Sequence, residues 1–228
     1  MTALLWLLLL VPLLLSALAR QRVMEQFDRY RRVANRMGVT GAEAARALLD
    51  AYGLRRVRIE PAPGALTDHY DGQARVLRLS APVAMERSVA ALGIAVHEVA
   101  HAFQDAEGSL AYRLRQAVGG PLAAMAPWSG FILIGGLWFG IPLMIFLSIA
   151  YVAGLVLFAL ATLPVELGAS VRALRMLQAS GLTDAAETGA VRRVLGAAAL
   201  TYLTGLLRQI GFFCALVLVF GAPRDVVM

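Results

Sequence analysis

The feature that most constrains this fold is an apolar run without a single charge, which extends from Val118 to Pro164. One helical crossing of a bilayer needs only about 20 apolar residues, so the run is long enough for two crossings. Gly140-Ile141-Pro142 lies near its middle, and such a sequence is where a helix is expected to end and the chain to reverse. We therefore predict a transmembrane hairpin, with helices near 121–139 and 143–163.

The rest of the chain also favours a membrane protein. Hydrophobic residues make up 59% of the sequence and charged residues only 16%, a balance that is unusual for a soluble enzyme. Thr2–Ala19 is a first span; its end resembles a signal-peptidase site, but no charge precedes it and arginines follow, so we interpret it as a retained anchor. The stretch 195–221 contains Arg208, and is either a fourth span with a pocket-facing arginine or a shorter helix along the interface.

The chemistry is indicated by His97-Glu98-Val99-Ala100-His101, which contains two of only three histidines. On a helix, His97 and His101 point the same way and can bind one zinc ion, while Glu98 can reach a water on that ion. Ser88 is a suitable N-cap for this helix and Gly108 a suitable stop. The alternative is a buried helix with two hydrogen-bonded histidines, but a chance match is expected on the order of once in a thousand such sequences.

Glu166 is the expected third zinc ligand. Two crossings return the chain to the side that it left, and Glu166 is the first carboxylate after the hairpin. A catalytic zinc takes three protein ligands and keeps one position open, and two histidines with one glutamate form a standard set. The alternative role of Glu166 is a charge favoured at a helix N-terminus. The competing carboxylates lie on the same helix as His101 or in a polar stretch typical of a solvated segment: Asp105, Glu107, Asp184 and Glu187.

A small polar α+β subdomain is predicted between the first span and Ser88. Residues 22–37 have helical periodicity, Thr40 and Glu43 form a capping box that opens a second helix, and 57–60 and 74–79 are typical of short strands. An edge strand beside the zinc helix could bind an extended peptide through its backbone. For this role we favour the strand directly before that helix, formed by Arg75, Val76, Leu77, Arg78 and Leu79.

The net charge of +6 comes from arginines that lie beside the predicted spans, and the chain contains no lysine. By the positive-inside rule, these arginines place the active site on the cytoplasmic face and the N-terminus outside. They are spread over several segments, so anionic lipid headgroups explain them better than nucleic acid does. The pairs are Arg20 and Arg22, Arg113 and Arg115, Arg172 and Arg175, Arg192 and Arg193. The single cysteine, Cys214, excludes a disulfide within the chain.

Four segments of this sequence together resemble the YugP-type membrane-bound neutral zinc metallopeptidases of bacteria. The segments are Leu66-Thr67-Asp68-His69-Tyr70-Asp71, Leu77-Arg78-Leu79-Ser80, Ala95-Val96-His97-Glu98-Val99-Ala100-His101-Ala102 and Thr162-Leu163-Pro164-Val165-Glu166-Leu167-Gly168-Ala169-Ser170. The resemblance implies a zinc-dependent endopeptidase. Gly168 stands where relatives commonly carry an aspartate, and Gly72 where they commonly carry proline. In related zincins an acidic residue near Gly168 often supports a zinc histidine, so that supporting role has no candidate in the sequence.

The predicted mechanism uses Zn²⁺ held by His97, His101 and Glu166, with Glu98 as the general base. A further donor is needed for the oxyanion of the transition state, and His69, beside Tyr70, is a candidate. An ordinary loop histidine, hydrogen-bonded within the turn 68–71, is an equally good interpretation.

Taken together, we expect a mainly α, polytopic membrane protein with a zincin-like helix pair, a small α+β subdomain and about four transmembrane helices. The expected order is an anchor (1–19), a cytoplasmic catalytic region (20–116), the hairpin (117–164), a cytoplasmic ligand helix (165–193) and a C-terminal apolar helix (194–228). Such a protein would reside in the cell (inner) membrane and cleave membrane or membrane-proximal proteins. This activity would suit the quality control of membrane proteins. The alternatives are a catalytically silent zinc scaffold that binds partner proteins and a zinc-stabilised structural protein, and membership of a larger assembly is left open.

Overall fold

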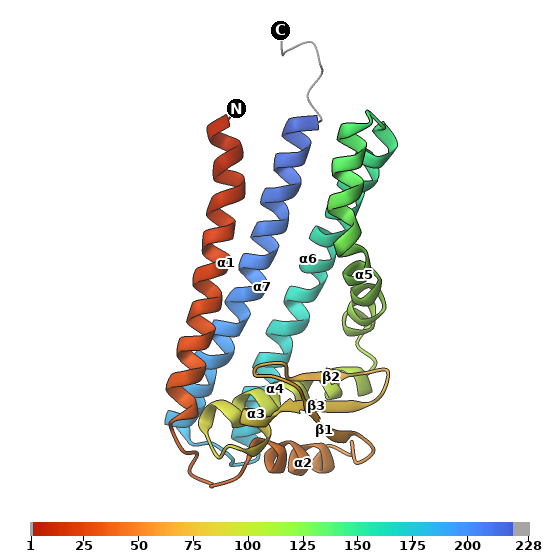
Figure 1. The fold of residues 1–228 in the computed structure, drawn as a ribbon. Coiled ribbons are helices and arrows are strands. Elements are labelled where there is room, and N and C mark those ends of the chain that lie inside the picture. Colours follow the sequence, from red (N-terminus) through yellow and green to blue (C-terminus); the bar gives the residue numbers. More distant parts are fainter. Residues whose placement is uncertain (1, 221–228) are drawn as a thin grey trace. The chain divides into compact units, whose positions relative to one another are not determined.

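A computed structural model describes residues 2–220. Seven helices and three strands follow one another along these residues (Figure 1). In chain order they are α1 (Thr2–Arg31), α2 (Gly41–Ala51), β1 (Arg58–Ala62), β2 (His69–Asp71), β3 (Val76–Ser80), α3 (Ala81–Met85), α4 (Val89–Ala106), α5 (Leu110–Trp138), α6 (Pro142–Ala179) and α7 (Ala185–Phe220). They form two compact units. We call them the apolar unit (2–19, 114–163 and 201–220) and the polar unit (Arg20–Arg113 and Pro164–Leu200).

The apolar unit is built from parts of four helices, each long and apolar enough to cross a membrane: α1, α5, α6 and α7. The predicted reversal is confirmed, since α5 ends at Trp138, Gly140 has a φ of 64° and α6 begins at Pro142. Proline suits the first helical position because its missing N–H has no partner there in any helix. The mainly α, polytopic architecture that the sequence predicts is therefore the architecture of the described chain.

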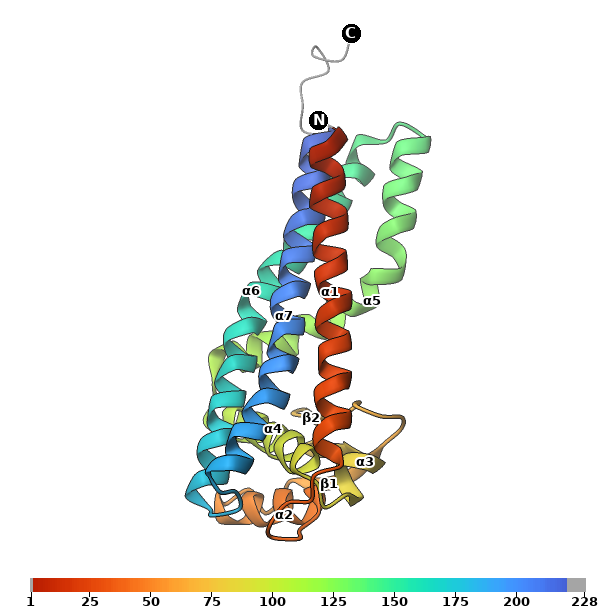
Figure 2. The ribbon, with the colours of Figure 1, turned by 90° about the vertical axis from the view of Figure 1, so that its left-hand side faces the viewer.

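Helices α1 and α7 run side by side within the apolar unit, as both ribbon views show (Figures 1 and 2). Ser16 of α1 donates a hydrogen bond to the carbonyl of Thr204 on α7 at 3.2 Å. Further along, Gly211 lies so close to α1 that a Cβ atom there would be 2.2 Å from the Leu8 carbonyl oxygen. Backbones approach this closely only where small residues line the interface, which is typical of membrane helices.

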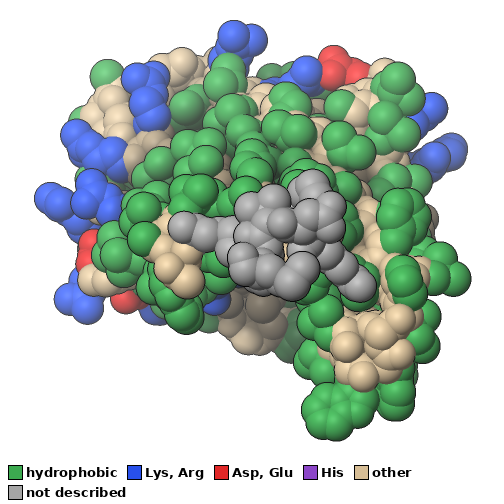
Figure 3. Space-filling view, turned by 90° about the horizontal axis from the view of Figure 1, so that it is seen from above, with side chains coloured by type: hydrophobic (Ala, Val, Ile, Leu, Met, Phe, Trp, Pro, Cys, Tyr) green, Lys and Arg blue, Asp and Glu red, His purple; other side chains and the backbone are tan. Residues whose placement is uncertain are grey.

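The apolar unit presents its hydrophobic side chains outward. Trp138 is 83% exposed and Phe131 is 72% exposed. Seen from above, the described side chains on this face are mostly hydrophobic (Figure 3). Soluble proteins rarely expose such a continuous apolar surface, so lipid is its natural surrounding. The sequence left two interpretations open for the stretch 195–221. Its residues 195–220 belong to the continuous helix α7, one of the four candidate spans, and residue 221 lies outside the described residues.

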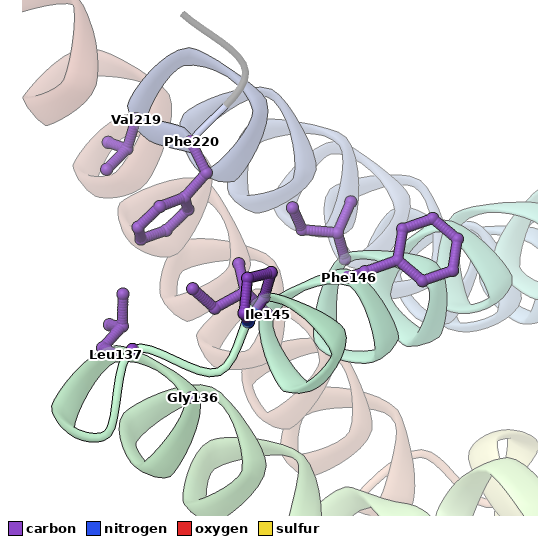
Figure 4. A pocket seen from close by; sticks show the side chains of 9 residues that line it. Gly136, Leu137, Ile145, Phe146, Val219 and Phe220 are labelled. Atoms are coloured by element: carbon purple, nitrogen blue, oxygen red, sulfur yellow. The ribbon is translucent and has the colours of Figure 1, made fainter. Parts of the chain in front are cut away.

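An apolar cavity of about 430 Å³ opens between the α5–α6 turn and the end of α7. Its walls include Leu137, Ile145, Phe146, Val219 and Phe220 (Figure 4). None of the lining side chains carries a polar group. It can therefore hold hydrocarbon but offers nothing that would select a particular ligand.

The polar unit contains the three-stranded sheet, whose order is β1-β3-β2. β1 pairs with β3 in parallel, with Arg58 opposite Val76, and β2 pairs with β3 antiparallel, with Tyr70 opposite Leu77. Helix α4 packs against β2 and β3, and α2 packs against α4. Tyr70, Leu77 and Leu79 of this sheet join buried side chains of α4 in one hydrophobic core.

Three expectations from the sequence need correction. The segment Arg75–Leu79 is not an edge strand, since β3 is the centre of the sheet and both its neighbours are paired with it. The edge beside α4 is β2, a strand of three residues that is too short to produce a recognisable alternation in sequence. In addition, α1 continues through residue 31, and α6 continues without a break past Pro164, so Glu166 lies inside a long helix and not at a helix start.

Candidate metal centre

Helix α4 carries the two histidines of the candidate centre. Its N-terminus is fixed as the sequence predicts, with the Ser88 hydroxyl accepting a hydrogen bond from the backbone N–H of Ala91 at 3.1 Å. Its C-terminus is followed by Gly108, whose φ of 73° ends the helix. Four residues apart on one helix, His97 and His101 lie on the same face.

Helix α6 brings Glu166 to these histidines. Glu166 is 2% exposed, and its Oε2 lies 3.2 Å from Nε2 of His97 and 3.5 Å from Nε2 of His101. In a tetrahedral zinc site with bonds of about 2.1 Å, neighbouring donor atoms are roughly 3.4 Å apart. The three side chains form a group able to hold a metal ion, and both the spacing and the two-nitrogen, one-oxygen donor set fit zinc.

The remaining ring nitrogens of the two histidines have partners that leave Nε2 for the metal. Nδ1 of His101 lies 2.9 Å from Oε1 of Gln104, and Nδ1 of His97 lies 3.4 Å from Oγ of Ser170. Gln104 is itself held in place, because its Nε2 donates to the carbonyl of Val165 at 3.0 Å. Contacts of this kind fix the orientation of a metal-binding imidazole and the nitrogen that it offers.

Gln104 also lies beside Gly168, the position at which the sequence offered no supporting residue for a zinc histidine. A Cβ atom added to Gly168 would lie 3.4 Å from Nε2 of Gln104, which is ordinary van der Waals contact. The glutamine side chain therefore contacts His101 from α4 itself, next to this position of α6. Sequence reasoning missed Gln104, although its position three residues after His101 places it on the same face of the helix.

Glu98 lies beside the metal-binding group without belonging to it. Its side chain is buried, and Oε2 accepts a hydrogen bond from the backbone N–H of Tyr70 at 3.1 Å. This N–H group does not pair with β3, because its acceptor is the Glu98 side chain of α4. A buried carboxylate at the position after His97 on the same helix is suited to accept a proton.

The structure separates His69 from its neighbour Tyr70. The His69 ring is exposed, and its Nδ1 lies 2.8 Å from the carbonyl of Thr67. Successive side chains of a strand point to opposite faces, and it is Tyr70 that turns toward α4, where its hydroxyl donates to Asp105 at 3.0 Å. Burial, followed by this bond, raises the pKa of Tyr70, so its hydroxyl stays protonated. His69 does not belong to the metal-binding group; it lies in β2 and not in a loop, and its ring contacts Thr67, just outside the turn 68–71.

Two carboxylates of the recognised motifs hold β2 against β3. Asp68 accepts hydrogen bonds from the backbone N–H of Ser80 at 2.7 Å and from its hydroxyl at 3.0 Å, and burial raises the pKa of Asp68. The pKa of Asp71 is lowered by the backbone N–H of Ala74 and by the Arg78 guanidinium, 2.7 Å away. These two residues therefore have structural roles: they hold the Tyr70 backbone beside α4.

Comparison with known proteins agrees with this site. Residues 5–221 match the family described as "Putative neutral zinc metallopeptidase", and the chain belongs to that family. One relative is the "Putative membrane protease YugP" of Bacillus subtilis (strain 168), which is 39% identical over 211 residues, covering 92% of this chain and 94% of the relative. No solved structure matches the chain.

Proposed function

We propose that this chain is a zinc-dependent endopeptidase of the membrane in which His97, His101 and Glu166 hold the metal and Glu98 is the general base. The observation that supports this most is the convergence of these three donor atoms beside a buried carboxylate. Three protein ligands leave a fourth position for water, which is the composition of catalytic rather than structural zinc sites. For this reason we favour an enzyme over a silent scaffold.

A bound zinc ion supplies Lewis-acid activation of the attacking water and of the scissile carbonyl. The chain's own residues then supply proton transfer and position. Glu98 takes a proton from the attacking water and delivers it to the leaving amine. Gln104 and Ser170 keep the two imidazoles oriented. We propose Tyr70 in place of His69 as the donor near the developing oxyanion, because its phenol lies on the α4 side of β2 and remains protonated; to act, its hydroxyl has to turn from Asp105 to the oxyanion.

The substrate strand that we propose is β2 in place of β3. β2 is paired on one side only within the described residues, and its open edge carries the Tyr70 N–H that contacts Glu98. An extended peptide added along this edge would bring its backbone to the general base with little dependence on its side chains. Peptides with an N-methyl group at single backbone positions test this: blocking the hydrogen bonds of alternate residues should reduce kcat/KM, whereas uniform tolerance would contradict it.

The substrates that we propose are membrane-associated or membrane-proximal proteins, cut at the cytoplasmic face of the bacterial inner membrane. The support is the arginine-rich flanks of the four candidate spans, which by the positive-inside rule mark the cytoplasmic side. A protease so anchored meets polypeptides near that surface, a location that suits quality control of membrane proteins.

The direct test uses the purified full-length protein in detergent, with unfolded casein as substrate and zinc content measured on the same samples. Glu98→Gln should lower kcat by about 10²- to 10⁴-fold and leave zinc near one per chain. Glu107→Gln is the matched control, because Glu107 caps the same helix but is exposed and pairs with Arg172; it should cleave at nearly the parent rate. Equal activity of Glu98→Gln and parent would exclude the general-base role, and absence of zinc from the parent would exclude the metal centre.

A further inference from the structure

Tyr112 is the largest fully buried side chain in the described part of the chain, with an exposure of 2%. It lies in the first turn of α5, which belongs to the polar unit. The backbone N–H of Tyr112 donates to Oγ of Ser109 at 3.4 Å, which fixes the start of the helix. Tyr112 belongs to none of the motifs recognised in the sequence and has no role in the mechanism proposed above.

The ring of Tyr112 packs against the His101 imidazole. The two ring centroids are 5.9 Å apart and the ring planes are inclined by 32°, an offset arrangement in which aromatic rings attract one another. The same imidazole has a hydrogen-bond partner, since its Nδ1 lies 2.9 Å from Oε1 of Gln104. One hydrogen bond selects the nitrogen that faces the metal but still allows the imidazole to tilt about that bond. A second ring that lies close to parallel restricts this tilt, so Tyr112 supplies a restraint that Gln104 does not.

Tyr112 also packs against Tyr70, the residue that we propose as the oxyanion donor. Their ring centroids are 6.4 Å apart and their planes are inclined by 33°. The backbone N–H of Tyr70 donates to Glu98 at 3.1 Å, and its hydroxyl donates to Asp105 at 3.0 Å. Between these two bonds, the Tyr112 ring limits the space in which the phenol can move. Tyr112 is therefore a common neighbour of a candidate zinc ligand and of the proposed donor.

These contacts form a closed circuit through three elements of the polar unit. His101 of α4 contacts Tyr112 of α5, which contacts Tyr70 of β2. The hydroxyl of Tyr70 bonds in turn to Asp105, which is again on α4. His101 and Asp105 are four residues apart and lie on the same face of that helix. In a closed circuit each ring is held from two sides, so a change at Tyr112 affects both the imidazole and the phenol.

We propose that Tyr112 is a positioning residue, whose ring sets the orientation of the His101 imidazole toward the metal and of the Tyr70 phenol toward the oxyanion. The part that concerns Tyr70 rests on the proposed function, whereas the restraint on His101 requires only a metal at the site. Both contacts are made by the ring, so Tyr112→Phe should preserve the role. Loss of the ring should weaken zinc binding through His101 and lower kcat without raising KM, because Tyr70 acts on the transition state and not on the bound substrate.

The test compares Tyr112→Leu and Tyr112→Phe with the parent, as full-length proteins in detergent. Competition with a chromogenic chelator measures zinc affinity, cleavage of unfolded casein at saturating zinc gives kcat and KM, and thermal unfolding of the zinc-free protein gives stability. Tyr112→Leu should lower zinc affinity about 10-fold, the lower end of the range for residues that orient a metal ligand. It should lower kcat by roughly 10- to 100-fold with KM nearly unchanged. Tyr112→Phe should match the parent in all three quantities.

Phe27→Leu is the matched control, because Phe27 is 3% exposed in the same hydrophobic core, where the Arg31 guanidinium lies over its ring. It should destabilise the zinc-free protein about as much as Tyr112→Leu does and leave zinc affinity, kcat and KM as in the parent. Equal losses of zinc affinity and kcat in the two leucine variants would show a purely structural role and overturn the proposal. A parent-like Tyr112→Leu would do the same. If Tyr112→Phe were as impaired as Tyr112→Leu, the effect would belong to the hydroxyl, and the role of the ring would be excluded.

The same measurements separate a failure of this inference from a failure of the proposed function. A parent that binds zinc but does not cleave casein would contradict the peptidase, and the zinc affinities of the variants would still decide whether Tyr112 positions His101. A parent with zinc and activity, together with Tyr112→Leu at parent levels, would contradict this inference alone. A parent without zinc would overturn both.

Discussion

The two units differ in where they place their polar and apolar side chains. The polar unit contains fourteen of the fifteen acidic residues, while the described part of the apolar unit contains none. In the polar unit each buried carboxylate lies among donors on neighbouring elements, as Glu166 does beside two histidines. In the apolar unit, polar side chains are few and the apolar ones face outward. The comparison shows that amino-acid composition alone identifies the lipid-facing unit. The residues of the metal centre come from distant parts of the sequence, so only the folded structure brings them together.

The largest expected effect comes from removing one of the converging ligands. Glu166→Ala should reduce zinc affinity by well over a hundredfold, beyond what a supporting residue costs, and should abolish cleavage. Measurement of zinc content and amide hydrogen exchange checks this: exchange should rise in α4 and around 164–179 and stay unchanged in the apolar unit. The removal of zinc from the parent by a chelator should give the same pattern. Faster exchange throughout both units would mean that the metal stabilises the whole chain, and it would contradict the expected difference between the two units.

Gln104→Leu should produce the next largest effect. It keeps the volume near His101 but removes the acceptor for Nδ1, so zinc affinity should fall about 10- to 100-fold. A competition assay with a chromogenic chelator measures it. Adding Gly168→Asp to Gln104→Leu should restore part of the affinity by supplying an acceptor from α6. No change in either variant would remove Gln104 from the list of residues that orient the site.

Two glycines allow the close approaches in the two units to be compared directly. A Cβ atom at Gly41 would lie 2.1 Å from the Val83 carbonyl oxygen, and one at Gly211 would lie 2.2 Å from that of Leu8. Gly41→Ala and Gly211→Ala should each destabilise by about 1–3 kcal/mol, because backbone has to move. Thermal unfolding followed by zinc release and by tryptophan fluorescence measures both. Zinc should be released earlier in Gly41→Ala only; early release in Gly211→Ala would show that the units unfold together.

The smallest expected effect is that of the half-buried Asp71–Arg78 pair. The folded state lowers the pKa of Asp71, so the carboxylate stabilises the fold above the unfolded pKa of about 3.9. This contribution is lost as pH falls through the lower folded pKa. Asp71→Asn should therefore cost less than about 1 kcal/mol at pH 7, and the difference should shrink in acid. A chemical denaturation series in pH checks this, and a difference that grows on acidification would contradict the assignment.

Local signals made much of the fold predictable. The cap at Ser88, the stop at Gly108 and the reversal at Gly140 depend on neighbouring residues, and each is where the sequence placed it. The order of the strands depends on pairing between distant segments, so the sequence could not assign the central place to β3. The histidine pair was visible from spacing alone, and Glu166 from its position after the hairpin. Gln104 was visible in sequence, but only its contact with His101 gives it a role.

The candidate zinc site has a consequence for the synthesis of the protein. His101 and Glu166 are separated by the hairpin of α5 and α6, so a growing chain carries both histidines well before the glutamate exists. A ribosome that stalls within the hairpin releases a fragment with an incomplete ligand set. In the proposed enzyme, cleavage could therefore begin only after α6 has been translated as far as Glu166.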